Sequence, residues 1–291
     1  MKRLLIIFSF MLVSCHPNNH IDVQGHRGCR GLLPENSLQA FKKALDLGVN
    51  TLELDLAISK DHLVVVSHEP YMNHEIALDT LGQPISEVNE TSFNLYNMSY
   101  SQIKKFDCGS KMHPRFPNQK KVKVYKPLLE EVFKLAENES KQTINYNIEI
   151  KSLPEYDTVF TPEVNEFVSL VLAELKQFNV EQRTVLQSFD IRALEAVKTQ
   201  NPSIVTSLLV DENEDIFIKL NELSYKPEVI SPYYKLLDKS LVQSLQAKGY
   251  KIIPWTLNEK DDINLMIAYG VNGIISDYPD QVIELLNVGK D

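Results

Sequence analysis

The sequence predicts an α/β protein, a single (β/α)8 barrel of the TIM-barrel type with an insertion between its second strand and second helix. Short β-like runs alternate with amphipathic helical runs from Asp22 onward, which is the pattern of parallel α/β folds. Eight such pairs occur. A chain of 291 residues, 43% of them hydrophobic, is long enough for one barrel of about 250 residues with a full core.

The first residues are typical of an export signal. Lys2-Arg3 precede an apolar run at 4–13 that is too short to span a bilayer. The run ends in Leu-Val-Ser followed by Cys15, which resembles a bacterial lipobox, where the peptidase cuts before the cysteine and its thiol carries diacylglycerol. The alternative is an ordinary signal peptide in which Cys15 is incidental.

We therefore expect a signal peptide at 1–14, a lipidated linker at 15–21 and a barrel domain at 22–291. The protein is expected to be exported and lipid-anchored to the bacterial cell envelope, at the periplasmic or the surface face, so that the membrane is a partner through the anchor. No later stretch of the sequence is long and apolar enough for a transmembrane helix.

The predicted elements follow from periodicity. Strands are predicted, in chain order, at 23–26, 51–58, 143–151, 184–188, 205–210, 229–233, 251–257 and 273–276. Helices are predicted at 37–47, 128–138, 164–178, 191–200, 215–223, 239–248, 261–269 and 281–286. The first helix illustrates the criteria, because Asn36 is expected to cap it and Gly48 to end it, while its apolar residues recur at helical spacing.

The interval between the second strand and its helix is too long for a simple loop, since about 70 residues lie there. We place the insertion at about 70–126. Between 104 and 126 it contains eight lysines and arginines and a single acid, Asp107. An insertion at this point leaves the carboxyl end of a strand, where barrel active sites lie, and we expect it to serve the site.

Charge and cysteine content exclude some classes of function. A net charge of −9 and a pI near 5.4 argue against nucleic-acid binding, which needs a basic surface. No Cys/His metal spacing occurs, and the two remaining cysteines, Cys29 and Cys108, could be bridged or free. No protein partner is identifiable from the sequence.

Carboxylates alternate with leucines in the second strand. Glu53 and Asp55 point to one face and the leucines between them to the other, so the acids are expected to face the barrel lumen. Burying two like charges is costly without a compensating cation, which makes a bound metal the natural partner. The plainer alternative is a solvent-facing strand with ordinary surface acids.

The third strand repeats this design with Glu149 and Lys151. Glu53, Asp55 and Glu149 then form an all-oxygen set, which suits one hard divalent cation, Ca²⁺ or Mg²⁺, rather than Zn²⁺. Lys151 lies one step further toward the strand end and could hold a substrate phosphate. Its alternative role is an ion pair with one of the acids.

Two histidines flank this cluster in the sequence. His26 ends the first strand, and His68 follows an apolar run. Cleaving a phosphodiester needs a base for the nucleophile and an acid for the leaving alkoxide, and imidazole can serve as either near neutral pH. Arg27 could add a planar fork for the phosphate oxygens.

These residues belong to spaced motifs that run in order through almost the whole mature chain. The motifs are Gly25-His26-Arg27-Gly28, Pro34-Glu35-Asn36-Ser37, Ala40-Phe41, Glu53-Leu54-Asp55, Val66-Ser67-His68-Glu69, Pro127-Leu128-Leu129-Glu130-Glu131, Ile148-Glu149-Ile150-Lys151, Gln187-Ser188-Phe189-Asp190, Trp255-Thr256-Leu257-Asn258 and Gly273-Ile274-Ile275-Ser276-Asp277-Tyr278-Pro279. Together they resemble the signature of the glycerophosphodiester phosphodiesterase family. Departures are mild: Ser37 stands where the family usually has Thr, Glu69 where it often has Asp and Leu257 where it often has Val.

The resemblance implies a TIM barrel that hydrolyses small glycerophosphodiesters to sn-glycerol 3-phosphate and an alcohol. Residue by residue, it implies three metal ligands (Glu53, Asp55 and Glu149), two general acid-base histidines (His26 and His68) and two phosphate-binding cations (Arg27 and Lys151). It further implies that Trp255 packs against the glycerol or the leaving group, with a rim aromatic as the alternative. Asp277 is expected to support the site rather than to bind the metal.

Two alternatives stay open. The same barrel could act as a phospholipase D-like or C-like phosphodiesterase on lysophospholipids, or the chain could be a phosphodiester-binding lipoprotein without catalysis. The nucleophile could be water or the glycerol 2-hydroxyl.

Overall fold

The structure, a computed structural model, describes residues 21–288. The predicted signal peptide and the lipidation site, Cys15, lie outside the described residues. Nine strands are described: β1 (Asp22–Gly25), β2 (Thr51–Ile58), β3 (Val64–Val66), β4 (Asn145–Ile150), β5 (Thr184–Ser188), β6 (Val205–Val210), β7 (Val229–Pro232), β8 (Lys251–Ile252) and β9 (Gly273–Ser276). The α-helices are α1 (Leu38–Leu47), α2 (Tyr100–Ile103), α3 (Leu129–Ser140), α4 (Val164–Phe178), α5 (Ile191–Gln200), α6 (Ile216–Glu222), α7 (Lys239–Ala247), α8 (Lys260–Tyr269) and α9 (Pro279–Asn287).

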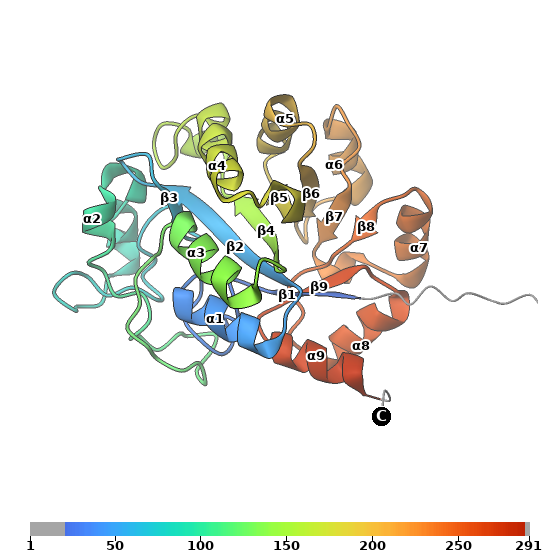
Figure 1. The fold of residues 1–291 in the computed structure, drawn as a ribbon, viewed down its shortest axis with the longest axis horizontal. Coiled ribbons are helices and arrows are strands. Elements are labelled where there is room, and N and C mark those ends of the chain that lie inside the picture. Colours follow the sequence, from blue (N-terminus) through green and yellow to red (C-terminus); the bar gives the residue numbers. More distant parts are fainter. Residues whose placement is uncertain (1–20, 289–291) are drawn as a thin grey trace, which may run out of the picture.

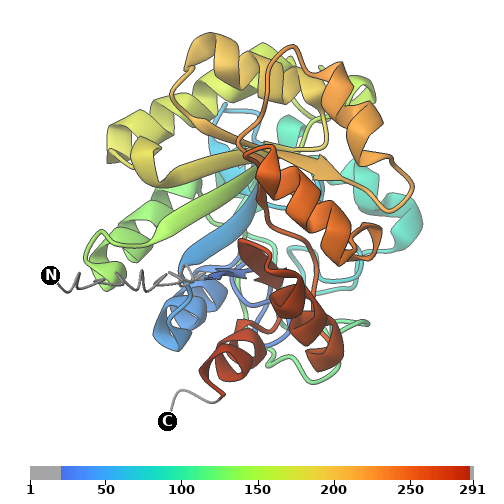
Figure 2. The same ribbon diagram turned by 90° about the vertical axis from the view of Figure 1, so that its right-hand side faces the viewer.

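Eight parallel strands form the barrel in the order β8-β7-β6-β5-β4-β2-β1-β9. Backbone hydrogen bonds join the two ends of the sheet. Asn272, just before β9, donates to Ile252 of β8 over 2.8 Å, and Leu257, beyond β8, donates to Ile275 of β9 over 3.0 Å. The helices surround the strands, as Figures 1 and 2 show in two views. The predicted (β/α)8 barrel is therefore confirmed, with its seam between β8 and β9.

Two details of the prediction are wrong. The strand predicted at 251–257 ends at Ile252, because Pro254 has no N–H to give to a ladder. The cap of α1 is Ser37, whose side chain accepts from the N–H of Ala40 over 3.1 Å. Asn36, which we expected in that role, instead donates its side-chain amide to Asp55 over 2.8 Å.

The main core lies between the barrel and its helices. Leu52, Leu54 and Leu56 of β2 are fully buried there, in one cluster with Phe41 of α1 and Phe133 of α3. Since side chains alternate along a strand, the intervening residues of β2 face the lumen. The core packing thus fixes the direction in which the acids of β2 point.

The insertion lies beside β3 (Figure 1). Its apolar side chains form a second, smaller core there. β3 pairs antiparallel with β2, and Val65 on it packs with Met72, Leu95 and Phe106 of the insertion. Cys108 is also buried in this cluster, and both it and Cys29 are free thiols. Among residues 21–288 no helix is both long and apolar enough to cross a membrane.

Candidate active site

The predicted site residues meet at the carboxyl ends of β1, β2 and β4. They line a cavity of about 170 Å³ whose walls include His26, Arg27, Glu53, His68, Glu149, Lys151 and Trp255. Asp55 lies in the same cluster of acids. Residues from both halves of the sequence therefore converge on one cavity.

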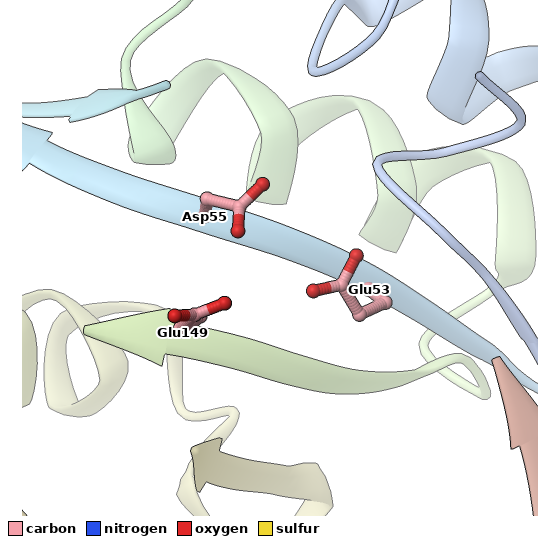
Figure 3. Close-up of side chains that lie close together, drawn as sticks. All are labelled: Glu53, Asp55 and Glu149. Carbon is pink, nitrogen blue, oxygen red and sulfur yellow. The ribbon is translucent and has the colours of Figure 1, made fainter. Parts of the chain in front are cut away.

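Three carboxylates form the floor of the site. Asp55 of β2 and Glu149 of β4 are partners in the strand register, and Glu53 lies two residues earlier on β2. One oxygen from each lies within 4.8 Å of the others, and all three side chains are buried. Figure 3 shows Glu53 and Asp55 on β2 and Glu149 on the neighbouring β4.

The electrostatics of this cluster are unbalanced. Burial, with the neighbouring charge of Asp55, raises the pKa of Glu53 well above its usual value. Burial also raises the pKa of Glu149, to about 7, although Lys151 opposes the shift. The pKa of Asp55 is lowered despite its burial, because Lys151 and Arg27 lie beside it. Two of three buried carboxylates are thus short of positive charge.

A hard divalent cation fits this donor set. The side chains offer only oxygen ligands, and a cation among them would lower the raised pKa values of Glu53 and Glu149. Glu53 is also held in place, since it accepts the backbone N–H of Arg27 over 2.8 Å and the side-chain amide of Gln187 over 2.9 Å. The residues present are therefore suited to one Ca²⁺ or Mg²⁺.

His26 is oriented by an acid from the far end of the chain. Its Nδ1 lies 2.7 Å from Asp277, and its Nε2 lies 3.9 Å from Glu53. Arg30 and Asn258 both donate to the same Asp277 carboxylate, at 2.8 Å each. Burial lowers the pKa of His26 to about 4, against the opposing effect of Asp277. The imidazole is therefore neutral near pH 7.

His68 has a similar arrangement on the other side of the cavity. Its Nδ1 lies 2.6 Å from the carboxylate of Glu69. Burial and the nearby charge of Arg27 lower its pKa. Each histidine thus has a carboxylate at Nδ1, which leaves Nε2 to exchange a proton with a substrate oxygen.

The two predicted phosphate-binding cations are already engaged with acids. Arg27 donates to Glu35 over 2.7 Å, and its Nε lies 3.3 Å from Asp55. Lys151 lies 2.8 Å from Glu149, so it forms the ion pair that we considered as the alternative and also lines the cavity. Burial opposes the charge of Lys151, but Glu149 and Asp55 outweigh it and raise its pKa. Both side chains therefore remain cations at the cavity wall.

Another part of the cavity wall is aromatic. Trp255 donates its indole N–H to the Ser231 carbonyl over 2.8 Å, which fixes its ring. Phe189 packs edge-on against it, with ring centroids 5.6 Å apart. A flat apolar wall beside the polar floor can hold the carbon skeleton of a substrate.

Sequence reasoning missed three residues of this site. Gln187 orients Glu53, and Arg30 holds Asp277. Arg115 reaches the cavity from the basic part of the insertion and forms no ion pair with any residue in the described range. Gln187 is the first residue of the motif that ends at Asp190, and Arg30 lies two residues after the motif that ends at Gly28, whereas Arg115 carried no signal beyond its charge.

Comparisons with known proteins agree with this geometry. The model of the glycerophosphoryl diester phosphodiesterase family matches residues 26–281. A glycerophosphodiester phosphodiesterase from Caldanaerobacter subterraneus is 32% identical over 270 residues, which span 92% of this chain and 98% of that relative.

Solved structures share the fold. A Silicibacter pomeroyi protein that carries the same family name matches with a TM-score of 0.83 and 29% identity, over 91% of this chain and 93% of its own. An Oleispira antarctica phosphodiesterase, solved in complex with the product sn-glycerol-3-phosphate, matches with a TM-score of 0.72 and 21% identity, over 91% and 96% of the two chains.

Proposed function

This chain belongs to the glycerophosphoryl diester phosphodiesterase family and is a phosphodiesterase, and from that premise we propose how it works: it splits glycerophosphodiesters into sn-glycerol 3-phosphate and an alcohol by acid-base catalysis at His26 and His68. The observation that carries the proposal is the pairing of these two imidazoles, each backed by a carboxylate, around one carboxylate-floored cavity.

The two histidines divide the proton transfers between them. With Nδ1–H donated to Asp277, neutral His26 presents a lone pair at Nε2, and His68 is placed in the same way by Glu69. One imidazole takes the proton of the attacking oxygen. The bound phosphodiester is an anion and favours the protonated form of the other imidazole, which gives its proton to the leaving alkoxide. A phosphodiester bound between them needs no further acid or base.

The cations of the site bind the phosphate and hold it in position. Arg27 is fixed by Glu35 and presents a planar guanidinium, while Lys151 offers a point charge from the end of β4. A divalent cation held by Glu53, Asp55 and Glu149 would supply charge neutralisation at the phosphate oxygens. Trp255 and Phe189 form the wall against which the glycerol carbons pack.

A kinetic assay of the purified domain tests the proposal. We expect glycerol 3-phosphate and free alcohol as products, loss of activity in EDTA and recovery with Ca²⁺ or Mg²⁺. His26→Ala and His68→Ala should each lower kcat by about a thousandfold with unchanged thermal unfolding, since general acid-base catalysis contributes about 10² to 10⁴.

His74→Ala is the matched control, because His74 also has a carboxylate at Nδ1, that of Glu90 at 2.7 Å, but lies outside the cavity. Near wild-type kcat in either catalytic variant would remove the acid-base assignment. Release of a phosphorylated alcohol and free glycerol would instead favour phospholipase C-like chemistry.

We also propose that the protein is exported and held at the cell envelope by diacylglycerol on Cys15. Support comes from the sequence, where a charged start, a short apolar run and a lipobox-like ending precede the cysteine. The structured barrel starts shortly afterwards, at Asp22, so the anchor would lie close to the folded domain.

A further inference from the structure

A second cavity of about 310 Å³ opens from the catalytic one past His68. Four residues line both cavities, namely His68, Glu149, Lys151 and Phe189. Trp255, His26 and Arg27 line only the first, whereas Tyr71 and Tyr156 line only the second. A phosphodiester has two substituents, so a glycerol packed on Trp255 leaves the second cavity for the alcohol that departs.

The walls of this second cavity are aromatic and come from two separate loops. Tyr71 belongs to the insertion and Tyr156 to the connection between β4 and α4, and both rings pack against Phe160, with centroids 6.0 and 5.3 Å away. The side chain of Asn94 ties the two loops together by donating to the Val159 carbonyl over 2.7 Å. The two tyrosine rings are thus held as a fixed pair of walls.

A carboxylate adds negative charge to the lining of this cavity. Glu69 lines the cavity, and its carboxylate lies 2.6 Å from Nδ1 of His68, an imidazole whose pKa is lowered by burial and by Arg27. Burial raises the pKa of Tyr71 to about 12 and also raises that of Tyr156, and the charge of Glu69 adds to both shifts. Both phenols therefore stay neutral, and both rings lie in the field of an acid.

Positive charge near this cavity is already compensated. Lys151 faces it, and its ammonium lies 2.8 Å from Glu149 and 3.5 Å from Asp55. When ionised, the three carboxylates Glu53, Asp55 and Glu149 carry three negative charges, which equal the charge of Lys151 together with that of one divalent cation. Aromatic rings with a nearby carboxylate attract an organic cation, and they suit a quaternary ammonium group in particular, because that group has no N–H to donate and needs no hydrogen-bond partner.

From these contacts we infer that the second cavity is the leaving-group subsite and that it selects diesters whose alcohol carries a quaternary ammonium or ammonium group, with Tyr71 and Tyr156 as the specificity-determining residues. This inference rests on the proposed function, since it assigns the second substituent of the same diester.

The test compares a diester that has a cationic alcohol group with an isostere whose alcohol group is uncharged. Glycerophosphocholine and the glycerophosphodiester of 3,3-dimethylbutanol differ only in the exchange of the ammonium nitrogen for carbon, so size and shape are matched. We expect kcat/KM to favour the choline ester by roughly tenfold in the wild type, the scale of a partly desolvated cation–π contact. Tyr71→Leu and Tyr156→Leu should each reduce this ratio about threefold or more, and the double variant should bring it close to one.

Conservative and distant variants complete the design. Tyr71→Phe keeps the ring and should keep the ratio within about twofold. Tyr250→Leu removes a tyrosine that precedes β8, at the opposite end of the barrel, and should change nothing. Thermal unfolding shows whether each variant is folded. The ratio of the two kcat/KM values is measured on one preparation of enzyme, so it does not depend on the fraction that is folded.

The outcomes distinguish the two levels of the proposal. An enzyme that hydrolyses both esters with a ratio near one, or that prefers the uncharged ester, overturns the cationic subsite while leaving the phosphodiesterase mechanism intact. Absence of turnover on every glycerophosphodiester, with metal present, would instead overturn the proposed function.

Discussion

At the scale of single residues, the chemistry depends on groups that never touch the substrate. Asp277 accepts from three side chains at once: His26, Arg30 and Asn258. Arg30 and Asn258 donate to both oxygens of Asp277, and the charge of Arg30 lowers the pKa of this carboxyl group. The ionised carboxylate can only accept, so His26 is the donor at Nδ1. Asp277 therefore sets which nitrogen of His26 carries the proton. It acts as a positioning residue.

Replacing Asp277 by Asn tests this role. An amide NH2 turned toward His26 would remove the acceptor that fixes its tautomer, and one turned the other way would oppose the donors of Arg30 and Asn258. In both orientations the negative charge beside His26 is lost. We expect kcat to fall by about a hundredfold or more, with a much smaller change in KM, as is typical when the partner of a functional histidine is removed. The pH–rate profile should shift as well.

Asp262→Asn is the matched control, since Asp262 accepts only from Tyr234, over 2.8 Å, away from the cavity. A purely structural role for Asp277 would lower thermal stability and leave kcat and the pH profile of the folded fraction as they are. That result would contradict the tautomer argument.

At the scale of elements, the sequence was most informative for strands that have core residues on one face and site residues on the other. The alternation of β2 places its leucines in the core and Glu53 and Asp55 in the lumen, and β4 repeats the pattern with Glu149, so the metal cluster could be predicted from two short runs. The contact of His26 with Asp277 spans 251 residues, and no local pattern encodes it.

Other features could not be predicted from local sequence patterns, each for a different physical reason. Asn36 looks like a helix cap in the sequence, but a buried acid, Asp55, competes for its amide. The strand expected at 251–257 ends before Pro254. In the rest of that range, isolated backbone hydrogen bonds take the place of a regular ladder to β9. Tyr71 and Tyr156 lie in loops whose meeting depends on the tertiary fold.

Helix packing provides a prediction about stability and pH. Glu174 on α4 has a buried carboxylate oxygen without a hydrogen-bond partner, and burial together with Glu130 on α3 raises its pKa from 4.5 to about 7. Because the folded pKa is raised, the folded state is favoured while Glu174 is protonated, and this contribution is lost as pH rises from about 4.5 through 7.

Glu174→Gln removes the titrating group and keeps its shape. The variant should match the wild type near pH 4.5 and be more stable at pH 8, by on the order of 1 kcal/mol after allowance for solvent screening, or about 2 °C in Tm. Thermal unfolding across pH measures the difference. Glu222→Gln, at the exposed end of α6, controls for the loss of one surface charge. Equal pH dependence in wild type and Glu174→Gln would refute the assignment.

At the scale of the whole molecule, the position of β1 would set the orientation of the enzyme if Cys15 carries the proposed lipid. β1 starts at Asp22, at the amino ends of the barrel strands, whereas the catalytic cavity lies at their carboxyl ends. Asp22 follows Cys15 by seven residues, which can span at most about 25 Å. A lipid on Cys15 would therefore hold the amino face of the barrel near the membrane and leave the cavity facing the aqueous phase, where dissolved glycerophosphodiesters are found.

This arrangement predicts that anchoring and catalysis are separable. Cys15→Ser should abolish incorporation of labelled palmitate in cells, while Cys108→Ala, which removes a buried free thiol of the insertion, should leave labelling in place. On dissolved glycerophosphodiesters, the lipidated enzyme in vesicles and the unlipidated domain should have kcat/KM values within about twofold, because the cavity lies at the end of the barrel opposite the anchor. Labelling that survives in Cys15→Ser would contradict the anchor, and a vesicle-bound enzyme much slower than the free domain would contradict the orientation.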